Sequence, residues 1–186
     1  MRLIEQYKTE LRTKLGQELS IKNRNAVPKL EKMVVNIGTG SRRQNGKFLE
    51  LAIKDLALIT GQKPSSRKSH KAIAGFKLRT GEVIGLSVTL RGKRMYDFME
   101  RLIHVVMPRI RDFRGLQLSG FDGQGNYSFG IREHTVFPEI DHERLSEFYG
   151  IGVTMVTTAT SNEAAEALLR ALGLPLKKRA AAGEQE

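Results

Sequence analysis

Two segments of the chain alternate between apolar and polar residues, and this alternation restricts the possible folds more than any other feature. Within residues 82–91 every second position from Ile84 to Leu90 is apolar, and the set is Ile84, Leu86, Val88 and Leu90. Residues 31–37 repeat the pattern with Met33, Val35 and Ile37. Successive side chains of a strand point to opposite faces, so such a strand buries only one face. One-sided burial is typical of antiparallel sheets, and the sequence therefore predicts one.

Other segments show the spacing of amphipathic helices, in which apolar residues recur every three or four positions. Four helices are predicted from this spacing, at residues 3–18, 46–60, 94–107 and 161–172. Asn45 is the predicted N-cap of the second helix and Gly61 its C-terminal stop. Thr160 and Glu163 have the spacing of a capping box for the last helix.

The remaining segments complete the expected architecture. Short strands are predicted at residues 126–132 and 151–158, a loop or hairpin at 62–81, and a long, loop-rich stretch at 109–150. Strands and helices do not follow a regular βαβ rhythm, which favours an α+β fold over a parallel one. We expect one antiparallel sheet with helices packed on one face and the other face open. Residues 1–176 are expected to form a single domain, and 177–186 a disordered tail.

Composition excludes several classes of protein. The 186 residues carry a net charge of +11 and contain no cysteine, which excludes disulfide frameworks, thiolate zinc sites and cysteine catalysis. Charges interrupt the N-terminal segment too often for a signal peptide, and no stretch has the length of an apolar membrane span. A cytoplasmic protein with no membrane partner is therefore expected. The positive charge calls for a polyanionic partner.

The charges are distributed unevenly along the chain. Residues 62–94 have a net charge of +8, with Glu82 as the one acidic residue, whereas residues 119–149 have a net charge of −4. A basic and an acidic region on one small domain suggest two different partners. A solvated surface would explain the acidic stretch equally well.

The polar side of the alternating strands supplies a candidate interface. Lys32 and Asn36 lie on this side of one strand, and Thr89 and Arg91 on that of the other. Hydroxyl and amide groups on a rigid sheet can bond base edges and 2′-hydroxyls, while Lys and Arg hold phosphates. The sequence thus predicts an open RNA-binding face. Aromatic residues make up only 6% of the chain, so base stacking on an aromatic platform is poorly supported.

Signals for catalysis or metal binding are weak. The four histidines are scattered without metal-ligand spacing, and the Gly38-Thr39-Gly40 turn is not followed by the residues of a phosphate-binding loop. We therefore expect a protein without enzymatic activity, cofactor or bound metal. Two alternatives stay open: an enzyme that clamps an anionic substrate with the basic segment, and an adaptor that binds an acidic protein.

Five blocks of sequence resemble ribosomal protein five of the large subunit, the 5S-rRNA-binding family, and the match runs in order from about residue 2 to residue 176. They are KLEKMVVNIGTG (29–40), LALITGQKP (56–64), FKLRTGEVIGLSVTLRG (76–92), MPRIRDFRGL (107–116) and FDGQGNYSFGIREHTVFPEI (121–140). The resemblance implies a structural ribosomal protein that holds 5S rRNA in the central protuberance. It also implies contacts with 23S rRNA, P-site tRNA, other central-protuberance proteins and small-subunit protein thirteen, the last in an intersubunit bridge within residues 109–147.

Residue by residue, the resemblance assigns 5S rRNA contacts to Asn36, Gln62, Thr89 and Arg91, and the nearby cations Lys32 and Lys63 complete the expected set. It assigns the tRNA contact to a hairpin at about residues 70–82, with Lys71, Lys77 and Arg79 as phosphate ligands. The chain departs from the family pattern at the base of this hairpin, at Ser65, Arg67 and His70.

Overall fold

A computed structural model describes residues 3–40, 42, 45–140 and 148–178 of the chain. Its strands are β1 (Leu30–Gly38), β2 (Ser65–Lys68), β3 (Val83–Leu90), β4 (Tyr127–Ile131) and β5 (Ile151–Thr157). Its α-helices are α1 (Leu3–Gln6), α2 (Arg12–Glu18), α3 (Gly46–Thr60), α4 (Gly92–Arg101) and α5 (Asn162–Ala171). A π-helical turn, η1 (Tyr7–Leu11), joins α1 to α2, and another, η5 (Leu102–Val106), extends α4. Short 3₁₀ turns include η2 (Arg24–Ala26), η4 (Ala74–Phe76) and η8 (His134–Val136).

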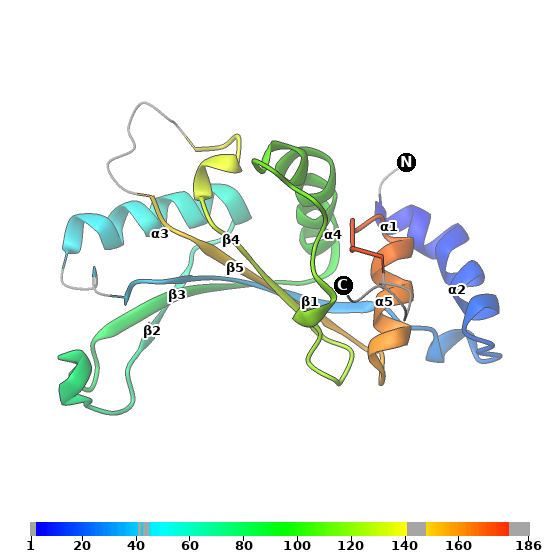
Figure 1. Cartoon of the computed structure of the whole chain (residues 1–186), viewed down its shortest axis with the longest axis horizontal. Helices are drawn as coiled ribbons and strands as arrows, with labels where there is room; N and C mark the ends of the chain where they lie inside the picture. The colour runs from blue at the N-terminus through cyan, green and yellow to red at the C-terminus, as the bar shows by residue number, and fades with distance from the viewer. Residues whose placement is uncertain (1–2, 41, 43–44, 141–147, 179–186) are drawn as a thin grey trace, which may run out of the picture.

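The five strands form one sheet in the order β2-β3-β1-β5-β4, and every neighbouring pair is antiparallel (Figure 1). The predicted α+β fold with an antiparallel sheet is therefore confirmed. β1 lies at the centre and pairs with both β3 and β5. The sheet thus joins strands from widely separated parts of the chain.

One face of the sheet carries the hydrophobic core, as the alternation predicts. Met33, Val35 and Ile37 of β1 are at most 1% exposed, and Leu86, Val88 and Leu90 pair beside them on β3. Helices α3 and α4 lie on this side of the sheet (Figure 1). Both contribute fully buried side chains, among them Leu56 from α3 and Met99 from α4.

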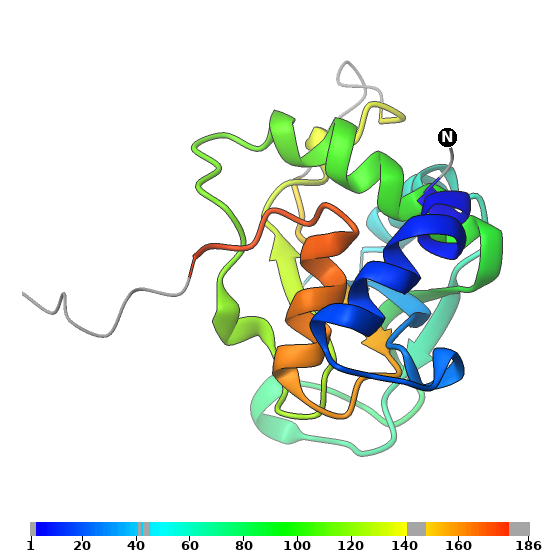
Figure 2. The same ribbon diagram turned by 90° about the vertical axis from the view of Figure 1, so that its right-hand side faces the viewer.

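The N-terminal helix follows the predicted spacing. Leu3, Tyr7, Leu11 and Leu15 recur every four residues and are all buried. The hydroxyl of Tyr7 donates a hydrogen bond of 2.7 Å to the carbonyl of Pro28, which ties the helix to the start of β1. Figure 2 shows α2 beside α5, so the two ends of the described chain pack against one another.

Both predicted ends of α3 are confirmed, but the predicted N-cap of α5 is not. Asn45 caps α3 by accepting a hydrogen bond from the amide of Phe48, and Gly61 ends the helix with a left-handed φ of 66°. At α5 the cap is Ser161, whose hydroxyl accepts from the amide of Ala164 at 3.3 Å. The predicted cap at Thr160 was therefore wrong by one position. The capped amide is that of Ala164, which lies three residues after Ser161.

The segment predicted as a loop or hairpin, residues 62–81, is part of a hairpin, because the exposed strand β2 pairs antiparallel with β3. Exposure in β3 departs from strict alternation at two positions. Ile84 was predicted on the buried face but is 40% exposed, while Ser87, predicted on the open face, is only 8% exposed. Residues 141–147 and 179–186 lie outside the described part of the chain, and the latter include most of the expected tail. The amide of Lys177, the first residue of that tail, donates to the carbonyl of Leu116 at 2.9 Å.

Candidate nucleic-acid interface

The face of the sheet opposite the core is built from aligned rows of small and polar residues. Strand register places Ser65, Ser87, Asn36, Gly152 and Gly130 in one row across all five strands. The next row contains Thr89, Val34, Thr154 and Ser128. Lys32 pairs with Val156 at the far end. We call this surface the open face.

Asn36 is the central side chain of the open face. It is exposed, whereas its neighbours Val35 and Ile37 are buried against the helices. Its amide lies over Gly152 of β5, since a Cβ atom on that glycine would be only 2.5 Å from Asn36 Oδ1 and 3.1 Å from Nδ2. The side chain therefore lies along the sheet, where a glycine leaves it room.

Gln62 and Thr89 meet where the chain passes from α3 to the sheet. Thr60 Oγ1 donates to the carbonyl of Leu56 at 2.6 Å, and Gly61 then turns the chain so that Gln62 faces β3. Gln62 Nε2 donates to the carbonyl of Thr89 at 3.4 Å. The hydroxyl-bearing side chain of Thr89 is exposed on the open face.

The predicted cations near Asn36 and Thr89 differ in their exposure and in their ion pairing. Arg91 directly follows β3, and its Nη1 lies 3.5 Å from Oε1 of Glu31. Both side chains are about half exposed, so this ion pair contributes at most about 1 kcal/mol and leaves the guanidinium available. Lys32 is half-buried and Lys63 is exposed. The structure thus brings Lys32, Asn36 and Thr89 onto one face, with Gln62 and Arg91 at its margin.

A second basic element extends from the end of the sheet. β2 and β3 continue into a hairpin that projects away from the helices (Figure 1). Its base is closed by the amide of Ser69 donating to the carbonyl of Glu82, and its tip by the pairing of Ile73 with Leu78. Most of its side chains are exposed, including those of Lys71, Lys77 and Arg79. Phe76 at the tip is 71% exposed.

Strand register also adds residues that the sequence pattern did not single out. Ser128 of β4 and Thr154 of β5 lie on the open face, and their hydroxyls are hydrogen-bonded at 3.0 Å. Gly130 and Gly152 stand opposite one another beside them. These residues were missed because local alternation identifies a strand's faces but not which strands lie next to one another.

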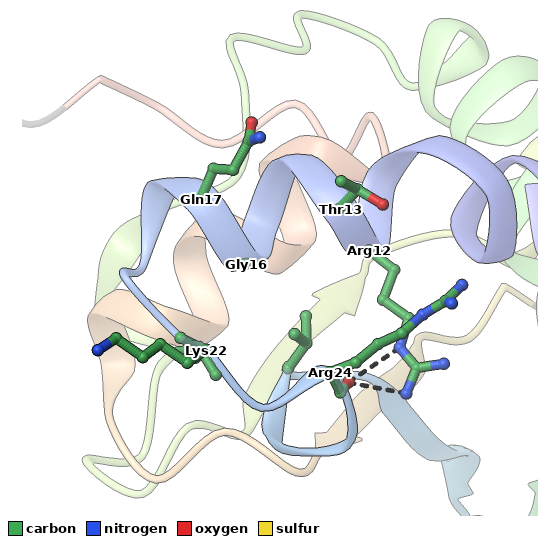
Figure 3. A pocket seen from close by; sticks show the side chains of 8 residues that line it. Arg12, Thr13, Gly16, Gln17, Lys22 and Arg24 are labelled. Carbon is green, nitrogen blue, oxygen red and sulfur yellow. Dashed lines mark hydrogen bonds between the residues drawn. The ribbon is translucent and has the colours of Figure 1, made fainter.

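A separate groove of about 350 Å³ lies between α2 and residues 21–27 (Figure 3). Basic side chains at its wall are Arg12, Lys22 and Arg24. Arg12 donates two hydrogen bonds, of 3.0 and 2.7 Å, to the carbonyl of Arg24, which fixes the guanidinium against the wall. The predicted RNA-binding residues do not line this groove.

The loop at residues 122–126 supplies hydrogen-bond donors to its own carboxylate, that of Asp122. The carboxylate of Asp122 accepts hydrogen bonds from the Asn126 side chain at 2.6 Å and from the amides of Gln124 and Asn126. These bonds lower the pKa of Asp122, and the bond from the Asn126 side chain has the largest effect.

Within the described ranges no group of three or more His, Asp or Glu side chains is placed to hold a metal ion, and no helix is long and apolar enough to cross a bilayer.

Comparison with known proteins assigns the chain to a family. Residues 23–79 match the family described as ribosomal protein L5, and residues 83–176 match the model of the C-terminus of this ribosomal family. Large ribosomal subunit protein uL5 of Syntrophomonas wolfei is 50% identical over 176 residues, which cover 95% of this chain and 99% of that protein. The uL5 proteins of Fusobacterium nucleatum and Corynebacterium diphtheriae are 53% and 52% identical, over 89% and 95% of this chain and 90% and 95% of their own lengths. With both halves matched and half of the residues identical over nearly the full length, the chain belongs to the ribosomal protein L5 family.

Proposed function

We propose that the open face of the sheet binds 5S rRNA and that the hairpin between β2 and β3 contacts P-site tRNA. The broader role follows from the family: the chain is a structural, non-enzymatic constituent of the large ribosomal subunit in the bacterial cytoplasm. The resemblance noted from the sequence extends this role to attaching 5S rRNA in the central protuberance.

The observation that carries the proposal is the exposure of Asn36 and Thr89 on a rigid, five-stranded platform. An asparagine amide offers both donors and an acceptor, and a threonine hydroxyl can serve as either. Such groups pair with base edges and with the 2′-hydroxyl that distinguishes RNA from DNA. Lys32, Lys63 and Arg91 at the border would neutralise phosphates and fix the position of the RNA.

The hairpin suits a different RNA. Lys71, Lys77 and Arg79 are exposed on an element that leaves the sheet at its β2–β3 end. Because this element projects beyond the platform, it can reach a second molecule while the open face is occupied. A tRNA backbone is the polyanion that the family resemblance favours.

The remaining partners follow from the resemblance. They are 23S rRNA, other central-protuberance proteins and small-subunit protein thirteen, the last at a surface within residues 109–147. The net charge of −4 over residues 119–149 supports a basic protein partner there. Several of the acidic residues, Asp141, Glu143 and Glu147, lie outside the described part of the chain. We also propose that residues 1–176 act as one unit, since β1 pairs with strands that lie both early and late in the rest of the chain.

The direct test is 5S rRNA affinity, measured by filter binding at one fixed salt concentration. Asn36→Ala and Thr89→Ala should each weaken binding by about 1–3 kcal/mol, because each leaves an RNA polar group buried without its partner. Gln6→Ala, which truncates an exposed amide on α1, is the matched control and should bind like the parent protein. Unchanged affinity in both open-face variants would show that 5S rRNA binds elsewhere.

A further inference from the structure

No feature of the fold itself requires a glycine at position 130. It stands in β4, at the edge of the sheet, where glycine weakens a strand. Its φ lies outside the left-handed region, and β4 pairs with β5 in continuous register without a bulge. A Cβ atom added there would meet nothing within 4 Å. Backbone conformation, strand irregularity and internal packing are therefore all excluded as explanations.

The remaining reason for glycine in a strand is the close approach of another molecule. Gly130 is exposed and lies on the open face, opposite Gly152. In the neighbouring row lie the hydroxyls of Ser128 and Thr154. This corner of the open face, formed by Ser128, Gly130, Gly152 and Thr154, thus has uncovered backbone at Gly130, the Asn36 amide over Gly152 and two hydroxyls beside them. We refer to it as the β4–β5 corner.

The chemistry of the corner fits a ribose–phosphate backbone. Peptide groups and hydroxyls carry no charge, and they donate and accept hydrogen bonds to the sugar and phosphate oxygens of a nucleic acid. No acidic residue occurs within β4, and the exposed Arg132 stands two positions beyond Gly130. The corner is also continuous with Asn36, whose amide lies over Gly152.

We propose that the RNA-binding surface extends across β5 to the edge strand β4, and that the ribose–phosphate backbone of the bound RNA lies directly against Gly130. Ser128 and Thr154 then bond to 2′-hydroxyl or phosphate oxygens. This inference rests on the proposed 5S rRNA binding and enlarges it: Asn36 and Thr89 contact one part of the RNA, and the β4–β5 corner supports the strand that continues from it.

The first test adds a side chain at Gly130. Gly130→Val should weaken 5S rRNA binding about tenfold, the equivalent of one lost hydrogen bond. The melting temperature should stay the same or rise, because valine favours a strand and meets no obstacle. Gly130→Ala should show a smaller loss of affinity. Gly46→Ala, at another exposed glycine with open space around it but on the helical side, is the control and should bind normally.

The outcomes separate this inference from the proposed function. Normal binding by Gly130→Val, with weakened binding by Asn36→Ala, would overturn the extension onto β4 and leave the open-face site intact. Normal binding by both variants would overturn both proposals.

The second test does not depend on weakened binding. The chain has no cysteine, so Ser128→Cys provides a single attachment point for an iron chelate that generates hydroxyl radicals. We expect strong local cleavage of bound 5S rRNA from this position. Leu58→Cys, on the exposed side of α3 and 59% exposed, is the control and should give little cleavage. Equal cleavage from the two positions would contradict RNA contact at the corner.

Discussion

The Asn36 side chain owes its orientation along the open face to the absence of a side chain at residue 152. Gly152 has an ordinary φ, so conformational freedom does not explain this glycine. The space above it is filled by the Asn36 amide, whose Oδ1 would lie 2.5 Å from an added Cβ. The glycine therefore orients the side chain on which the proposed RNA contact depends.

Gly152→Ala should consequently reduce 5S rRNA affinity although residue 152 supplies no side chain of its own. The new methyl group displaces the Asn36 amide, which is the far end of a flexible side chain, so the fold should tolerate the change. Filter binding should show a loss comparable to that of Asn36→Ala. The double variant Asn36→Ala/Gly152→Ala should be no weaker than Asn36→Ala alone, because both changes remove the same contact. Additive losses would contradict this coupling.

Alternation in the sequence was sufficient to find Asn36 and Thr89, because the faces of a strand follow from its side-chain period. It could not find Gly130, Gly152, Ser128 or Thr154 as members of the same surface. Their membership depends on β5 lying beside β1 and on the register between them, which no local pattern contains. Gln62 was identified from the family resemblance alone, and its bond to the Thr89 carbonyl shows why it lies near the sheet.

Among the elements, β2 is the strand that sequence reasoning failed to specify. Ser65–Lys68 contains no apolar residue and is exposed throughout. It is a strand because β3 provides a partner for its backbone, so tertiary pairing and not intrinsic propensity determines it. The long predicted elements α3 and β1 were found because their apolar residues are buried at the expected period.

The hairpin beyond β2 should be separable from the open face in function. The double variant Lys71→Gln/Arg79→Gln should weaken tRNA binding and leave 5S rRNA affinity unchanged. Each lost phosphate contact should also reduce the slope of log affinity against log salt by about 0.7–0.9. Salt titrations with tRNA and with 5S rRNA would measure both effects.

The double variant Lys47→Gln/Lys54→Gln, which neutralises two exposed lysines on α3, is the charge-matched comparison for the hairpin variant. It should change neither slope. If the hairpin variant lost affinity for 5S rRNA as strongly as for tRNA, the assignment of two RNAs to two elements would be wrong.

The whole molecule depends on one core that underlies both proposed sites. All four tyrosines of the chain are buried in it, at 1–7% exposure, and come from α4, η1, β4 and the segment before β5. Burial raises the pKa of Tyr7, and it raises the pKa of Tyr96 and of Tyr127 to about 12. Burial, together with the 2.6 Å hydrogen bond that Tyr149 donates to Asp55, raises the pKa of Tyr149 as well.

These raised values predict that the protein loses stability in alkali through its tyrosines. The folded state favours the neutral phenol, so this contribution is fully present below the ordinary tyrosine pKa of about 10 and is lost as pH rises through the folded values. Tyrosinate absorbance should therefore appear above about pH 10, together with the loss of the circular dichroism of the fold. Tyr149→Phe removes one ionisable phenol. The free energy of unfolding of this variant should therefore fall less between neutral and alkaline pH than that of the parent protein. Tyrosinate that formed near pH 10 while the circular dichroism stayed native would mean that the phenols are accessible to solvent, and would contradict a single core that holds both proposed RNA-binding elements in place.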